Sequence, residues 1–316
     1  MTSDGKSILV IGRDGQVARS LDETLSASGY HVVQIGRPET DLRNPSSVSE
    51  AIRAAQPDFI VNAAAYTAVD QAEVEPETAF AINAAGAQSA AEAASEIGAP
   101  IIHFSTDYVF DGSKGVPYVE TDAVSPLGVY GESKLAGESL VAEANPKHII
   151  LRTAWVFSPF GSNFVKTMLR LSRERPEINV VDDQRGSPTY APDLATTVCQ
   201  IISRLRTLSP SPECFGTFHA TNSGETSWYG FARAIIDGAA RRGGPQAIVH
   251  PIPTSAFPTK AHRPAYSVLS NDKLSHVYGI KLRPWPDALS EALDRIIGAR
   301  HEETPQRPKQ GFDSTA

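Results

Sequence analysis

The sequence predicts an α/β protein in which a doubly wound parallel sheet is followed by a smaller mixed α/β domain. Short apolar segments rich in Val and Ile alternate with helical segments through the first half of the chain. Such near-continuous apolar strands are typical of a parallel sheet covered by helices on both faces. After about residue 156 the connections become rich in proline and the elements shorter, which indicates a second domain.

The elements of the sheet follow one another in order. Apolar, β-branched segments that end before turn or helix signals predict strands, at residues 7–12, 31–36, 57–65, 100–110 and 147–157. Helical spacing, capping residues and an alanine-rich composition predict helices between them, at residues 15–29, 45–56 and 76–98 and around Tyr130. Gly98 is the expected C-cap of the alanine-rich helix.

The change of pattern sets the predicted domain boundaries. We expect a sheet domain over residues 1–155, to which a helix and a short strand return from about residues 191–221. An interleaved second domain is expected over residues 156–300. Residues 301–316 are polar and contain proline, and they are predicted to form a disordered tail.

Composition excludes several classes of protein. The 316 residues carry a formal net charge of -7 and the basic residues are dispersed, so no nucleic-acid partner is expected. Two cysteines in dissimilar settings argue against a disulfide scaffold. No apolar segment reaches the length of a signal sequence or membrane span, so a cytoplasmic location without a membrane partner is predicted. The eight histidines show no metal-ligand spacing, and no metal is expected.

A glycine turn follows the first predicted strand. Gly12, Gly15 and Ala18 lie at three-residue spacing where this strand turns into a helix. Small residues there let the backbone approach a pyrophosphate, which the free N–H groups of the helix N-terminus stabilise. In the first strand-helix unit of a parallel sheet, this spacing predicts a dinucleotide site.

The end of the second strand distinguishes the two nicotinamide cofactors. An acidic residue there would bind the ribose hydroxyls and repel a 2′-phosphate, whereas this chain has Gly36 and Arg37. An arginine suits the 2′-phosphate, so NADPH is the favoured cofactor and NADH remains possible. Arg37 could instead be a solvated loop residue, with Asp41 placed under the adenine.

A hydroxyl, a tyrosine and a lysine form the candidate catalytic group. Ser105 and Thr106 end the fourth predicted strand, on the side where ligands bind in such sheets. Tyr130 and Lys134 lie one helical turn apart and face the same way. A nearby ammonium would lower the pKa of the phenol, and the tyrosine could then protonate a carbonyl oxygen while Thr106 holds that oxygen.

These features resemble the extended short-chain dehydrogenase/reductases, and among them the enzymes that act on dTDP-4-dehydrorhamnose. The resemblance extends from residue 7 to about residue 297, through segments that include GRDGQVA, HFSTDYVFDG, PLGVYGESKLAGE and VVDDQRGSPT. It implies a Rossmann-like NAD(P)-binding fold. It also implies reduction of the 4-keto group of dTDP-4-dehydrorhamnose by NADPH in dTDP-rhamnose biosynthesis, with Tyr130 as proton donor.

The resemblance also implies which residues contact the ligands. Those that would contact the cofactor are Gly15, Gln16, Val17, Asp41, Leu42, Ala65, Tyr66, Thr67, Phe104, Tyr130 and Lys134. Those that would contact the sugar nucleotide are Thr106, Asp107 and Trp155. Asn163, Lys166 and Arg263 are further substrate candidates, because a sugar nucleotide requires cationic groups for its diphosphate and polar groups for its base and sugar.

Two features depart from the family pattern. Some members dimerise around Mg²⁺ through glutamates on the first helix and after a G-x-P-T segment, where this chain has Ser20 and Pro192. We therefore expect a monomer or a weak homodimer without a metal bridge. The Gly36–Arg37 pair, where other members have an acid, again favours NADPH.

Two alternative functions remain open at this point. One is a related sugar-nucleotide reductase or epimerase of the same superfamily; an epimerase would retain its NAD⁺ through purification, whereas a reductase must exchange it. The other is a non-catalytic nucleotide-binding subunit that resembles the β subunit of methionine adenosyltransferase. The complete set of Thr106, Tyr130 and Lys134 favours catalysis over the second alternative.

Overall fold

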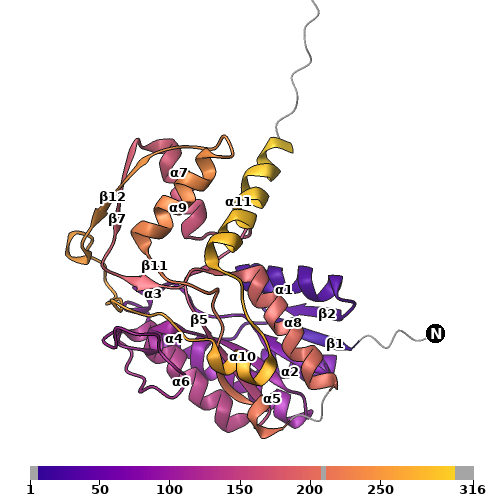
Figure 1. Ribbon diagram of the computed structural model, residues 1–316. Helices are drawn as coiled ribbons and strands as arrows, with labels where there is room; N and C mark the ends of the chain where they lie inside the picture. The colour runs from indigo at the N-terminus through magenta and orange to yellow at the C-terminus, as the bar shows by residue number, and fades with distance from the viewer. Residues whose placement is uncertain (1–5, 208–210, 303–316) are drawn as a thin grey trace, which may run out of the picture.

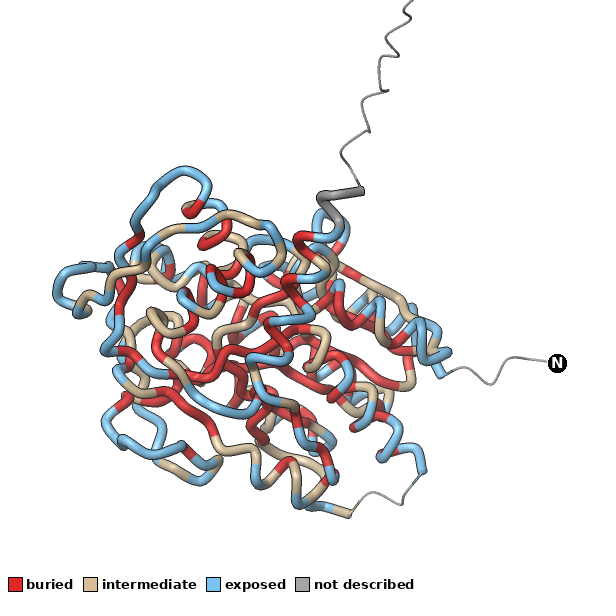
Figure 2. The backbone as a smooth tube through the Cα atoms, turned by 45° about the horizontal axis from the view of Figure 1, so that its top comes forward, coloured by how far each residue is buried: buried red, intermediate tan, exposed pale blue. Residues whose placement is uncertain are grey.

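The structure is a computed structural model that describes residues 6–207 and 211–302, with side chains as far as residue 298. Its last helix, α11 (Trp285–Glu302), continues two residues into the predicted tail. The remainder of that tail, residues 303–316, lies outside the described residues. Figure 2 shows buried backbone concentrated in the centre of the molecule and exposed backbone at its rim.

A six-stranded parallel sheet lies at the centre, with the strand order β10-β5-β4-β3-β1-β2. Its strands are β1 (Ser7–Ile11), β2 (His31–Ile35), β3 (Phe59–Asn62), β4 (Ile101–Thr106), β5 (His148–Thr153) and β10 (Gly216–His219). The five predicted strands are all present, and the doubly wound fold is confirmed. Because the chain moves from β1 to β2 on one side and from β3 onward on the other, a ligand crevice is expected at their carboxyl ends.

Helices cover both faces of this sheet (Figure 1). Ile8 and Val10 of β1 pack under α1 (Gln16–Ala27) and α8 (Ala191–Thr207), whereas the alternate residues Leu9 and Ile11 pack in the opposite layer. That opposite layer contains α2 (Pro45–Ala55), α5 (Ala87–Glu96) and α6 (Val129–Ala144). Alternate residues of the strand therefore pack into the cores on the two faces of the sheet.

The alanine-rich segment forms one helix with a π-helical turn inside it. The turn η1 (Ala81–Gly86) joins α4 (Pro76–Phe80) to α5. Within the turn, the buried Asn83 bonds the backbone N–H and C=O of Tyr66 and the hydroxyl of Ser133. Such insertions occur frequently at functional sites, and this one ties the helix to the loop after β3.

Replacing Gly137 with Ala should destabilise the fold where α6 crosses this turn. An added Cβ at Gly137 would lie 2.0 Å from the carbonyl oxygen of Asn83, so the two helices would have to separate. We expect the free energy of unfolding to fall by about 1–3 kcal/mol, which thermal unfolding would detect as a lower Tm. Gly298→Ala in α11 is the matched control because nothing lies within 4 Å of its added Cβ, and it should not lower Tm.

The second half of the chain builds another apolar core beside the sheet. This core lies among α7 (Phe164–Glu174), α9 (Trp228–Ala240), α11 and the parallel pair β7 (Glu177–Val181) and β12 (Ile248–Ile252). The antiparallel pair β8 (Arg185–Gly186) and β11 (Thr226–Ser227) and the parallel pair β6 (Val156–Phe157) and β9 (Thr189–Tyr190) connect it to the sheet. This region therefore combines helices with short strands, as predicted, and its strand pairs are both parallel and antiparallel.

The segment predicted to return to the sheet supplies α8 and β10. Short elements complete the described chain: α3 (Val69–Ala72), α10 (Asp272–Tyr278) and 3-10 turns at Asp107–Val109, Pro212–Cys214 and Thr254–Ala256. Within residues 6–207 and 211–302, none of the helices has both the length and the apolar character needed to span a membrane.

Candidate functional site

A cleft of about 960 Å³ opens at the carboxyl ends of the central strands. Every residue predicted to bind the cofactor lines it, namely Gly12, Gly15, Gln16, Val17, Arg37, Asp41, Leu42, Ala65, Tyr66, Thr67, Phe104, Tyr130 and Lys134. The substrate candidates Thr106, Asp107 and Trp155 line the same cleft. The topology thus brings together segments that are far apart in the sequence.

The glycine turn presents an open helix N-terminus to this cleft. Gly12 has φ +127°, and an added Cβ there would lie 3.1 Å from the Cβ of Ala18. Gly15 is the N-cap of α1, makes no side-chain cap and has open space where a Cβ would lie. The first N–H groups of α1 can therefore receive an anion such as a pyrophosphate.

Gln16 connects this turn to the second half of the chain. Its Oε1 accepts hydrogen bonds from Ser158 Oγ at 3.0 Å and from Asn163 Nδ2 at 2.9 Å. Its Nε2 donates to the carbonyl of Val156 at 3.3 Å. The side chain of Gln16 thereby holds the connection between β6 and α7 against the start of α1.

Arginines surround the cleft at the end of β2. Arg13, Arg37 and Arg43 all line it. Asp41 accepts a bidentate pair from Arg43, and this contact holds the pKa of the Asp41 carboxyl below its usual value. The acid near this strand end is therefore already neutralised by an arginine, which favours an anionic ligand group such as a 2′-phosphate.

Thr106 and Tyr130 meet at the end of β4. The Thr106 hydroxyl donates to Asp107 Oδ1 at 3.1 Å, accepts from the backbone N–H of Tyr108 and contacts the Tyr130 phenol. Burial raises the pKa of Tyr130 to about 12, and Thr106 opposes that shift only in part. The expectation of a lowered phenol pKa is therefore not met in the ligand-free protein, because desolvation of the phenolate outweighs the favourable contact.

The amine of Lys134 contacts β4. The side chain is 2 % exposed, and its Nζ donates to the carbonyl of Phe104 at 2.6 Å and lies 3.2 Å from His103 Nε2. Burial lowers the pKa of Lys134 to about 8, while Glu138 opposes this shift. Lys134 is not among the groups that shift the pKa of the neighbouring phenol.

Three buried polar atoms at this end of the sheet lack a partner among the described residues. They are Ser105 Oγ, Asp107 Oδ2 and Thr153 Oγ1, and all three residues line the cleft. Burial also raises the pKa of Asp107 to about 6. Buried polar groups normally have hydrogen-bond partners, so these atoms fit a polar ligand such as a nicotinamide and a keto sugar.

Trp155 forms the aromatic wall of the cleft. Its φ is +47°, and its ring stacks on Trp228 of α9 with centroids 3.5 Å apart. Gly186 allows this placement because an added Cβ would lie 2.5 Å from the Trp155 ring. The indole is therefore held in place from the second half of the chain.

Three predicted substrate residues lie outside the lining of the cleft. Asn163 is the N-cap of α7 and bonds the backbone N–H of Lys166, while Lys166 Nζ bonds the carbonyl of Gly161 at 3.0 Å. Arg263 forms an ion pair with Asp70 at 2.7 Å and bonds Tyr108. Their structural contacts do not require a ligand, and their roles in substrate binding remain predictions.

Sequence reasoning missed several residues that shape the site. Asn83 and His103 are buried beside it and position Tyr66 and Lys134. Arg13 and Arg43 also line the cleft, paired with Glu39 and Asp41. A buried amide in a π-helical turn leaves no periodic signal. For His103 a signal was available, because a histidine inside an otherwise apolar strand segment indicates a buried polar group.

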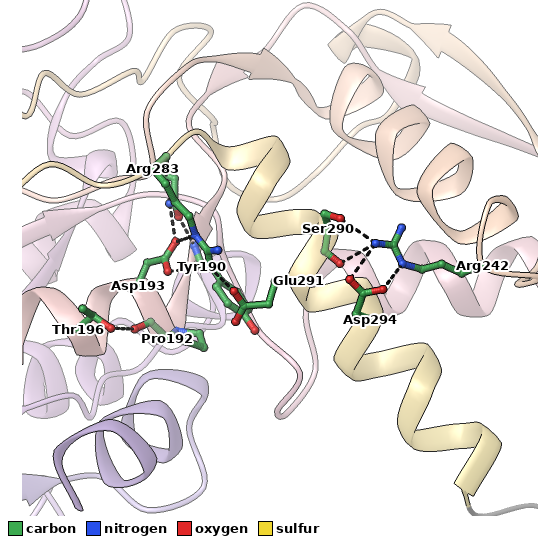
Figure 3. Close-up of polar contacts among 10 residues, drawn as sticks. Tyr190, Pro192, Asp193, Thr196, Arg242, Arg283, Ser290, Glu291 and Asp294 are labelled. Atoms are coloured by element: carbon green, nitrogen blue, oxygen red, sulfur yellow. Dashed lines mark hydrogen bonds and ion pairs between the residues drawn. The ribbon is translucent and has the colours of Figure 1, made fainter. Parts of the chain in front are cut away.

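Ser20 and Pro192, where some family members have glutamates that bind Mg²⁺, make structural hydrogen bonds instead. Ser20 is buried and donates to the carbonyl of Gln16. The carbonyl of Pro192 accepts from Thr196 (Figure 3). The acids nearby, Asp193 and Glu291, both pair with Arg283. Among the residues described here, no group of three His, Cys, Asp or Glu side chains could hold a metal ion.

Comparisons with known proteins agree along most of the chain. The profile of the family described as "RmlD substrate binding domain" matches residues 6–297. A dTDP-4-dehydrorhamnose reductase of Sinorhizobium fredii is 48% identical over 292 residues, covering 92% of this chain and 97% of the relative.

Solved structures give the same result. The crystal structure of a dTDP-4-dehydrorhamnose reductase from Clostridium acetobutylicum has a TM-score of 0.85 at 39% identity, with 91% of this chain and 98% of the other covered. The dTDP-4-dehydrorhamnose reductase of Bacillus anthracis, solved in complex with NADP, has a TM-score of 0.83 at 37% identity, with 91% and 98% covered. The architecture predicted from the sequence is confirmed.

Proposed function

The chain belongs to the RmlD substrate-binding-domain family, and from this premise we propose that it reduces the 4-keto group of dTDP-4-dehydrorhamnose to give dTDP-L-rhamnose, with NADPH as reductant. One observation carries the proposal. The glycine turn, the Thr106 hydroxyl and the Tyr130–Lys134 helix line a single cleft, in a chain whose reductase relatives match it over 92% of its length. The resemblance stated from the motifs is thereby confirmed.

Each group of residues in the cleft has a separate role in the proposed reaction. NADPH supplies the hydride when it is bound. The open N-terminus of α1 would hold its pyrophosphate, and Arg37 with Arg43 would face its 2′-phosphate. Tyr130 is placed to donate a proton to the substrate oxygen, Thr106 to hold that oxygen, and Lys134 to stabilise the phenolate that remains.

The residues that follow β4 and β5 would bind the sugar nucleotide. Trp155 offers an apolar surface to the 6-deoxy sugar, and Asp107 has one carboxyl oxygen without a partner among the described residues. Stacking on Trp228 fixes the indole before the ligand arrives, which reduces the ordering required on binding.

The direct test follows the loss of NADPH absorbance after dTDP-4-dehydrorhamnose is added to the purified chain. NADPH oxidation with formation of dTDP-L-rhamnose is the expected result. Tightly retained NAD⁺ together with epimerised product would instead identify an epimerase. Tight NADPH binding without turnover, combined with co-purification of a catalytic partner, would identify a regulatory subunit.

Replacing Arg37 with Ala should change the cofactor preference. If its guanidinium pairs with the 2′-phosphate, its loss removes a charge-assisted contact of about 1.5–3 kcal/mol. We expect the KM for NADPH to rise by roughly tenfold or more while the KM for NADH stays the same. Arg170→Ala in α7, which removes an exposed pair with Glu174, is the control. Equal changes for both cofactors in Arg37→Ala would contradict the assignment.

We also propose that the chain works in the cytoplasm as a monomer or weak homodimer without a metal bridge. Ser20 and Pro192 lack the carboxylates of metal-bridged relatives, and this supports the assignment. Light scattering with and without Mg²⁺ tests the proposed oligomeric state, and a Mg²⁺-dependent dimer would contradict it.

A further inference from the structure

A buried histidine lies directly behind Lys134. His103 is on β4 and is 1% exposed. Its Nε2 lies 3.2 Å from Lys134 Nζ, and its Nδ1 lies 3.1 Å from Asn62 Nδ2. Asn62, His103 and Lys134 therefore form a continuous polar chain from β3 through β4 to α6.

The orientation of Asn62 decides which nitrogen of His103 carries the proton. Asn62 Oδ1 accepts from the backbone N–H of Ala64 at 3.2 Å, so the other end of the amide faces the ring. That end, Nδ2, can only donate. Nδ1 of His103 must then accept, and the single proton of the neutral imidazole lies on Nε2.

The Nε2 proton points at Lys134. An ammonium has three donors and no acceptor, whereas a neutral amine has one lone pair that can accept this proton. Lys134 already donates to the carbonyl of Phe104 at 2.6 Å. A neutral amine satisfies both contacts, but an ammonium would place two donors against each other.

We propose that His103 is a positioning residue for Lys134: Asn62 holds its ring in the Nε2–H form, and this N–H donates to the neutral amine of the lysine. The inference rests on the proposed function, in which Lys134 stabilises the Tyr130 phenolate. A lysine that must both hold and release a proton works best when its pKa lies near the working pH, and a donor to its neutral form lowers that pKa.

The other charged or titratable groups around Lys134 come from α6 and β5. Tyr130 and Glu138 flank it along α6, and Glu138 raises the pKa of Lys134. Arg152 of β5 pairs with Glu138 at 2.6 Å. Asp107 acts on Tyr130 and raises its pKa. Of the described groups, only His103 faces the amine from β4 through a ring N–H.

The test combines a direct observation of the ring with a pH profile. Heteronuclear NMR of the cofactor-free full chain, with labelled histidine, reports which ring nitrogen is protonated. His103→Gln assigns the signal and retains an amide N–H, whereas His103→Leu removes both ring nitrogens. His219→Leu is the matched control, because His219 is equally buried but its ring contacts Phe110 and not Lys134.

Above about pH 8, where Lys134 is a neutral amine, we expect the His103 ring to be neutral and protonated at Nε2. In the native protein kcat should fall above about pH 8, where Lys134 loses its proton. In His103→Leu this pKa should rise by about one unit, whereas in His103→Gln and His219→Leu it should stay near the native value.

Two results would overturn the inference. They are a His103 ring protonated at Nδ1 or at both nitrogens above about pH 8, and an unchanged pKa of kcat in His103→Leu. The NMR result requires neither turnover nor a folded variant with leucine. It therefore decides the tautomer even if the chain does not reduce the proposed substrate, and the two failures remain distinguishable.

Discussion

Tyr130→Phe is expected to lower kcat roughly 100- to 10,000-fold, because it removes the group that protonates the substrate oxygen. The pKa of the phenol is raised to about 12 by burial, so Tyr130 carries its proton throughout the neutral range. Phenylalanine preserves the ring and its edge contact with Tyr108, whose centroid lies 5.6 Å away. The substitution should therefore change chemistry and leave the fold and the KM for NADPH nearly unchanged.

Steady-state kinetics of Tyr130→Phe should be compared with those of Tyr118→Phe. Tyr118 is also buried, but its hydroxyl bonds Asp111 outside the cleft. Its loss should leave kcat within a few-fold of the native value. A native kcat in Tyr130→Phe would mean that another group protonates the substrate. Asp107, with a pKa of about 6, would then be the next candidate to test.

Glu138→Gln should destabilise the protein by about 3–5 kcal/mol, the typical result of removing one partner from a buried ion pair. Glu138 and Arg152 pair through two hydrogen bonds of 2.9 and 2.6 Å, and each side chain is 6% exposed. The remaining Nη1 of Arg152 has no hydrogen-bond partner among the described residues. The substitution would leave a desolvated guanidinium without a compensating charge.

Denaturant unfolding measures this loss, and a double variant controls for its cause. Glu138→Leu combined with Arg152→Met removes both charges and should recover most of the stability, because apolar side chains can replace a buried pair at little cost. If the double variant were as unstable as Glu138→Gln, packing around α6 and β5 would be responsible instead of the unpaired charge. Arg170→Ala, at an exposed pair, should change the free energy of unfolding by less than about 1 kcal/mol.

Much of the fold followed from the sequence because its signals are local. The apolar strands, the glycine turn after β1 and the helical spacing of Tyr130 and Lys134 depend on neighbouring residues only. Parallel topology then places the carboxyl ends of β1, β3 and β4 together. Part of the lining of the cleft could therefore be predicted from the residues themselves, including Gly12, Arg37 and Thr106. Other positions, such as Leu42 and Phe104, were implied by the family resemblance.

The tertiary structure decided what depends on partners distant in the sequence. Asn163 and Arg263 contact Gln16 and Asp70, which lie far away along the chain, and their role in substrate binding stays a prediction. The phenol pKa of Tyr130 is raised where the helical pairing with Lys134 predicted a decrease, because burial is a property of the whole packing arrangement. The protonation of Lys134 likewise depends on His103 and Asn62 from two neighbouring strands. Spacing along the chain determines which side chains share a face, whereas desolvation and hydrogen-bond partners are fixed only when the elements pack.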